Sequence, residues 1–118
     1  MILLILISIF LGAFGQILVK YGSANLEINF TLKYLIPSIL NIVKNLPVMM
    51  GIISYGVSFL IWIKVLSKTE LSYAYPMVSL GYIIVMIFSY FVFKENITFI
   101  RVLGMFFIIV GVVLISRS

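Results

Sequence analysis

Two polar side chains interrupt the first apolar segment of the sequence, in the stretch LGAFGQILVKYG. Ser8, Gly12, Gln16 and Lys20 recur every four residues, so on a helix they share one stripe. The amide of Gln16 donates and accepts hydrogen bonds, and the amine of Lys20 attracts an anion. Polar groups inside a membrane span are costly and mark pathways or binding sites. We interpret the stripe as the wall of a groove for a polar headgroup, with Gly12 and Gly15 leaving room beside it.

The glycines and the lysine of this segment can also be explained without a binding site. Glycines in a membrane helix also serve close packing against a neighbour, and Lys20 taken alone is explained as a side chain that snorkels to the interface. A second cation, Lys64, follows Trp62 near the end of another apolar segment, and we include it among the candidates for substrate binding.

The third apolar segment is the richest in hydroxyl groups. Within LSYAYPMVSLGY, helical spacing places Tyr75, Ser79 and Tyr82 on one side. Pro76 lacks a backbone N–H, so it removes one helical hydrogen bond and allows a kink. A kink used only for packing is the alternative. Since hydroxyls and the kink coincide, we predict that this segment contributes to a substrate site.

Several kinds of chemistry are excluded by composition. The chain has no cysteine and no histidine, which removes thiolates, the usual zinc ligands and the usual base near neutral pH. Its three acids, Glu27, Glu70 and Glu95, lie outside the middle of every apolar segment. We therefore expect no enzyme, no metal and no cofactor. The net charge of +5 is spread along the chain, so we expect no nucleic acid as partner.

The elements that must position these residues are membrane helices. Of 118 residues, 64% are hydrophobic, far more than a soluble domain carries. Apolar segments of about 20 residues match a hydrocarbon core about 30 Å thick, and in lipid such segments must be helical. We expect a retained first span rather than a cleaved signal peptide. The sequence predicts an all-α membrane protein, a single domain over residues 1–118 with spans at about 1–21, 48–66, 71–93 and 99–116.

The connections set the topology. Residues 67–70 and 94–98 are short links, which make neighbouring helices antiparallel and give an up-and-down bundle. The first connection is longer, and over residues 31–46 apolar side chains alternate with polar ones at helical spacing. This pattern predicts a helix lying in the membrane interface, bent at Pro37. An extension of the second span, bent at Pro47, explains the pattern equally well.

The last span presents small residues instead of polar ones. Gly104 and Gly111 are seven residues apart and fall on one face, as close helix approach requires. Four short helices enclose little volume, and transporters commonly bind substrate between two repeats. We expect a homodimer, or a heterodimer with a homologous subunit, that packs through these glycines.

Three pieces of the chain carry a resemblance to a known family: GQILVK, LSYAYPMVSLGYIIV and FKENITFIRVLGMFFIIVGVVLISRS. Nearly end to end, the sequence resembles the four-helix drug/metabolite transporter superfamily. It is most similar to the subunits that flip aminoarabinose-phosphoundecaprenol in bacterial inner membranes, and it is related to the small multidrug resistance exporters. The resemblance implies a multi-pass inner-membrane protein that flips a lipid-linked sugar, and it implies a structural role for Glu95, paired with Lys94 or Arg101.

The exporter branch of that superfamily differs at two positions. Its membrane glutamate, which exchanges protons for cationic drugs, corresponds to Gly12 here, and its tryptophan on the third helix corresponds to Val78. A glutamine and a lysine without an acid suit an anionic headgroup instead, such as a polyprenyl-phosphate glycoside. The alternatives are an exporter of small or cationic solutes that uses another coupling group, and a non-transporting partner subunit.

Overall fold

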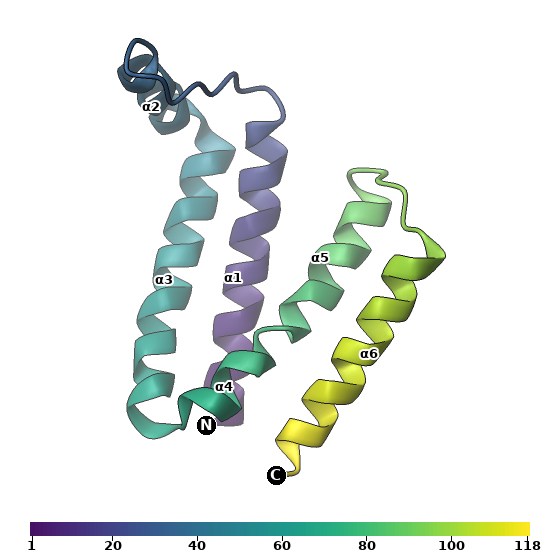
Figure 1. The fold of residues 1–118 in the computed structure, drawn as a ribbon. Helices are drawn as coiled ribbons and strands as arrows, with labels where there is room; N and C mark the ends of the chain where they lie inside the picture. The colour runs from purple at the N-terminus through teal and green to yellow at the C-terminus, as the bar shows by residue number, and fades with distance from the viewer.

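The computed structural model describes residues 1–118 and contains only helices (Figure 1). α1 (Ile2–Ser23), α3 (Leu46–Lys68) and α6 (Phe99–Ser116) are each a single span. The remaining span, Leu71–Phe91, consists of α4 (Leu71–Met77) and α5 (Leu80–Phe91). All four are long and apolar enough to cross a membrane, so the prediction of an all-α membrane protein with four transmembrane helices is confirmed.

The first connection contains a separate short helix, α2 (Leu35–Lys44), which begins four residues later than the sequence pattern indicates. Asn45 has an extended backbone and ends α2 before α3 begins, so α2 is not an extension of the second span. In Figure 1, α2 is seen nearly end-on while α3 runs upright, and α2 therefore crosses the end of α3. The Oγ of Ser38 fixes the preceding loop by accepting from the Asn29 N–H at 2.9 Å and donating to its carbonyl at 3.0 Å.

Capping residues explain where α3 and α6 begin. The side-chain oxygen of Asn45 accepts from the Val48 N–H at 3.1 Å, and Pro47 lies in the first turn, where a missing N–H costs nothing. Thr98 Oγ1 accepts from the Arg101 N–H at 3.2 Å and starts α6 in the same way. These polar caps fix the ends of two helices whose interiors are apolar.

The third span is broken near its middle. Pro76 lies inside α4, and the helix ends at Met77. Around Val78 and Ser79 the backbone hydrogen bonds connect residues three apart instead of four, as in the Ser79 N–H to Pro76 carbonyl bond at 3.0 Å. α5 then continues in a different direction (Figure 1). The break lies two residues beyond the proline.

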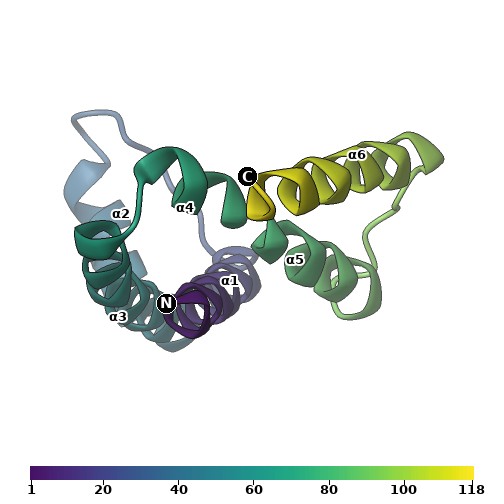
Figure 2. The same cartoon turned by 90° about the horizontal axis from the view of Figure 1, so that it is seen from below.

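The four spans alternate in direction, as predicted, but they form two pairs instead of one compact bundle. α1 and α3 lie side by side, whereas α5 and α6 lean away from them, and the view along the bundle separates the pairs again (Figures 1 and 2). The pairs meet at the end that holds both termini. The buried cluster there takes residues from α1, α3, α4 and α6: Ile5, Ile9, Val65, Ala74, Met77 and Val112.

The contact between α1 and α3 is backbone against backbone. A Cβ atom built on Gly51 would lie 2.6 Å from the Gly15 carbonyl oxygen, and one on Gly15 would lie 2.7 Å from the Gly51 carbonyl oxygen. A Cβ atom built on Gly22 would likewise be too close to atoms of Asn45 and Val48. Gly15 therefore serves packing and does not widen a groove. We call this contact the α1–α3 seam.

Candidate functional site

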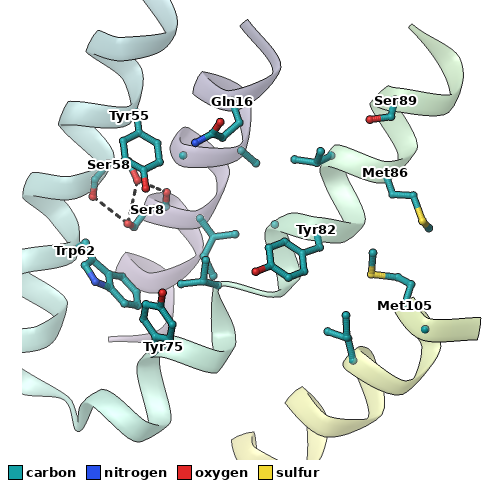
Figure 3. Close-up of a pocket in the computed structure, with 18 of the residues that line it drawn as sticks. Ser8, Gln16, Tyr55, Ser58, Trp62, Tyr75, Tyr82, Met86, Ser89 and Met105 are labelled. Atoms are coloured by element: carbon teal, nitrogen blue, oxygen red, sulfur yellow. Dashed lines mark hydrogen bonds between the residues drawn. The ribbon is translucent and has the colours of Figure 1, made fainter. Parts of the chain in front are cut away.

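A cavity of about 970 Å³ lies between the two helix pairs (Figure 3). It is lined by one face of α1 and α3, by Tyr75 of α4, by α5, and by α6 with the loop before it. The polar side chains of the lining are Ser8, Gln16, Tyr55, Ser58, Trp62, Tyr75, Tyr82, Ser89, Glu95 and Arg101. The rest of the wall is mainly apolar or glycine, so a few polar groups are set in an apolar surface, as is usual for small-molecule sites.

The stripe on α1 divides between the seam and the cavity. Ser8 is buried and exchanges hydrogen bonds with α3: Ser58 Oγ donates to the Ser8 carbonyl at 2.6 Å, and Ser8 Oγ donates to the Ser58 carbonyl at 3.0 Å. Gly12 faces Ser58, with 3.1 Å between a Cβ built there and Ser58 Oγ. Gln16, one turn further on, is exposed and lines the cavity. Lys20 lies beyond the lining.

Aromatic side chains from three helices form the opposite part of the cavity from Gln16. Figure 3 shows Trp62 of α3 beside Tyr75 of α4, with Tyr82 of α5 across the gap. Tyr75 is 65% exposed and Tyr82 is 52% exposed, so both rings are open to a ligand although they belong to spans. Aromatic rings with a polar edge present a flat apolar face and a hydrogen-bonding group together.

The remaining candidates from the sequence lie elsewhere. Lys64 is exposed on α3 and Ser79 is half-buried at the break in the third span, and neither lines the cavity. Gly104 lines the cavity, whereas Gly111 does not. A Cβ built on either glycine of α6 would meet nothing within 4 Å, so within one chain these glycines pack against no other helix.

Three charged groups gather at the loop end of the cavity. Lys20 Nζ lies 3.9 Å from Glu95 Oε1, the single ion pair of the chain, with side chains 58% and 38% exposed. Glu95 therefore pairs across the gap with α1, and the expectation that it pairs with Lys94 or Arg101 is wrong. Arg101 lines the cavity and donates from Nη1 to the Asn96 carbonyl at 3.3 Å, with no carboxylate as partner.

Local backbone geometry explains why Glu95 reaches the cavity. Lys94 adopts a left-handed conformation with a φ of 54° at the end of α5. The turn allows the Glu95 N–H to bond the Ser89 carbonyl at 2.9 Å. The chain therefore folds back over the end of α5, and Glu95 faces α1.

Several lining residues were not recognised from the sequence: Tyr55, Trp62, Ser89, Glu95 and Arg101. A periodic signal existed for some of them. Tyr55, Ser58 and Trp62 are spaced three and four apart, and Tyr82, Val85 and Ser89 repeat that spacing. Nothing in the spacing indicates that Glu95 meets a lysine 75 positions earlier in the chain.

Four membrane-type spans around a partly polar cavity define a multi-pass membrane protein of the transporter kind. The profile of the EamA-like transporter family matches residues 1–117, and the chain belongs to that family. The resemblance inferred from the motifs is therefore confirmed.

The relatives of the chain have names that describe one activity. A protein of Photorhabdus laumondii, named "Probable 4-amino-4-deoxy-L-arabinose-phosphoundecaprenol flippase subunit ArnF", is 36% identical over 120 residues, which cover 95% of this chain and 93% of that protein. An ArnE subunit of the same description from Pseudomonas savastanoi is 29% identical over 116 residues, covering 98% and 96%. Another ArnE subunit, from Pseudomonas fluorescens, is 37% identical over 68 residues, covering 58% and 60%. No solved structure matches the chain.

Proposed function

We propose that this chain is a subunit of a flippase that moves a lipid-linked sugar, such as a polyprenyl-phosphate glycoside, across the inner membrane of the cell. Relatives that align over nearly the whole chain have names that describe this activity. The observation that carries the proposal for this chain is the composition of the cavity: hydroxyl, amide and guanidinium groups line a space between membrane spans.

The lining suits the separate parts of such a lipid. The amide of Gln16 and the hydroxyls of Tyr75 and Tyr82 can hydrogen-bond sugar hydroxyls, and the aromatic faces can stack on the ring. Arg101, which has no carboxylate partner, can bind a phosphate through two parallel N–H groups. Lys20 adds a second cation at the rim, while the polyprenyl tail stays in the surrounding lipid.

Transport then requires no covalent step. A headgroup crossing bare hydrocarbon loses its hydrogen bonds to water, at several kcal/mol for each unsatisfied group. A cavity that replaces some of those bonds lowers the barrier. The chain has no carboxylate in the middle of a span, so it lacks the group with which an exporter would exchange protons for a cation.

The proposal includes a second subunit, either another copy of this chain or a homologue. The relatives are themselves named as subunits. α6 presents large apolar side chains away from the protein, with Phe107 and Leu114, one turn to either side of Gly111, each more than half exposed. We propose this face of α6 as the assembly surface.

The experiment is translocation of a polyprenyl-phosphate glycoside in proteoliposomes, measured as the fraction of sugar that a membrane-impermeant reagent can modify with time. We expect Arg101→Gln to slow translocation about tenfold, which corresponds to about 1.4 kcal/mol, and Gln16→Ala to slow it by a similar factor. Lys68→Gln removes a cation from the far end of α3 and is the matched control. Translocation at the empty-liposome rate for the unmodified protein, alone and with its partner subunit, would refute the proposal.

A further inference from the structure

The carboxylate at the rim of the cavity is unexplained by a purely anionic ligand. Glu95 lines the same cavity as Arg101, and a phosphate bound by Arg101 would be repelled by a neighbouring carboxylate. The other two acids do not line this cavity. The hydrogen bond that closes the turn after α5 belongs to the backbone N–H of Glu95, which any residue supplies, and does not require the carboxylate.

From this arrangement, and resting on the proposed function, we infer that Glu95 recognises a positive charge on the sugar of the transported lipid, and that Lys20 occupies Glu95 in the absence of that ligand. Lys20 and Glu95 come from opposite helix pairs and meet across the opening of the cavity. The lysine amine is chemically the same cation as the ammonium group of an amino sugar.

The geometry of the pair is that of an interaction a ligand can replace. The N···O distance of 3.9 Å is longer than a charge-assisted hydrogen bond, and both side chains are more than a third exposed. Exposed pairs of this kind contribute little to stability. An arriving ammonium group therefore exchanges one weak ion pair for another and gains the contacts of the rest of the ligand.

The three charges also match a ligand that carries both signs. Glu95 supplies one negative group, and Arg101 and Lys20 supply two positive groups at the same end of the cavity. When the ammonium displaces Lys20, the phosphate stays bound by Arg101. A sugar phosphate with an amino group pairs with both Glu95 and Arg101, whereas a neutral sugar phosphate leaves the Lys20–Glu95 pair in place.

The test compares two ligands that differ only at the nitrogen: a polyprenyl-phosphate amino sugar and its N-acetylated form. Trp62 is the only tryptophan of the chain and lines the cavity, so its fluorescence reports binding of either ligand to the full-length protein in nanodiscs. We expect the unmodified protein to bind the amino form at least tenfold more tightly. In Glu95→Gln, we expect this preference to fall to about one while binding of the N-acetylated form is retained.

The reciprocal variant, Lys20→Met, removes the competitor for Glu95. The ratio of the two affinities should therefore shift further toward the amino form, even if the variant weakens or strengthens the binding of both ligands. Glu27→Gln is the matched control, because it neutralises an acid at the same end of the protein outside this cavity. The ratio of the two affinities separates recognition from a purely structural contact, which would change both affinities by the same factor.

Each other outcome is decisive. Equal binding of the two forms by the unmodified protein, or an unchanged ratio in Glu95→Gln or Lys20→Met, would overturn the inference and leave the proposed function standing. Failure of the unmodified protein to bind either form would overturn the proposed function, and the inference with it.

Discussion

The two helix pairs of this protein use glycine in opposite ways. In the α1–α3 seam, Gly15 and Gly51 bring two backbones into contact, and Ser8 and Ser58 exchange hydrogen bonds across it. In the α5–α6 pair, Gly111 faces open space. Glycine therefore closes one pair and leaves an unoccupied surface on the other.

The difference between the two pairs shows which interactions hold membrane helices together. Lipid is as apolar as a leucine side chain, so burying apolar surface between spans provides little driving force, and close packing and hydrogen bonds must supply it. The α1–α3 seam has both. The second pair has few such contacts and leans away, which opens the cavity. We therefore regard the α1–α3 pair as the fixed part and the α5–α6 pair as the part that adapts to ligand and partner.

The largest effect is expected from Gly51→Leu. Even the Cβ atom would lie 2.6 Å from the Gly15 carbonyl oxygen, so the two backbones must move apart. We expect a loss of about 3 kcal/mol in the free energy of unfolding, measured by denaturant titration in mild detergent. Gly56→Leu on the same helix is the control, because a Cβ there meets nothing within 4 Å. Equal destabilisation by both substitutions would contradict the seam.

A smaller effect is expected from removing the serine pair. Ser58→Ala deletes the bond to the Ser8 carbonyl, and Ser8→Ala deletes the return bond. Hydrogen bonds between membrane helices contribute about 0.6 kcal/mol on average, so each variant should lose about 1 kcal/mol or less. A double-mutant cycle on unfolding should show coupling between the two sites, with exposed Ser72→Ala as control. Strictly additive losses would argue against a reciprocal pair.

The smallest effect on the folded chain is expected from Gly111→Leu. Its side chain would enter open space, so the unfolding free energy of the separated subunit should change by less than about 0.5 kcal/mol. The fraction of dimer, measured by native mass spectrometry, should fall sharply. An unaltered dimer would reject the α6 face as the assembly surface, and a destabilised monomer would show that α6 packs within its own chain.

The parts of the fold that the lipid bilayer dictates were predictable from the sequence. A bilayer requires helices of a certain length, so the spans could be located from hydropathy to within a few residues, and the amphipathic pattern after the first span indicated α2. The tilt of the α5–α6 pair was not predictable, because spacing tells which residues share a face and not which helix that face meets. Gly15 and Gly111 illustrate this: similar signals have opposite outcomes.

The candidate site was predictable in part for the same reason. Gln16, Tyr75 and Tyr82 were selected as polar residues in apolar segments, and the structure brings all three to the cavity. Lys64 was selected by charge alone and lies outside it. Glu95 and Arg101 were overlooked as cavity residues because they lie at the ends of helices, where charged side chains are ordinary and give no signal until the fold brings them together.

The buried cluster at the terminal end has a further consequence for access to the two sides of the membrane. Ile5 of α1, Val65 of α3 and Val112 of α6 belong to an apolar contact between the two helix pairs, whose side chains make no hydrogen bonds. In water, separating such a contact would expose apolar surface at a cost of about 25 cal/mol per Å². In a bilayer, acyl chains can fill the opening gap, so that penalty is absent. The cluster can therefore separate at little cost, which allows the α5–α6 pair to tilt about the Val78–Ser79 break and to open the cavity at the end that holds both termini.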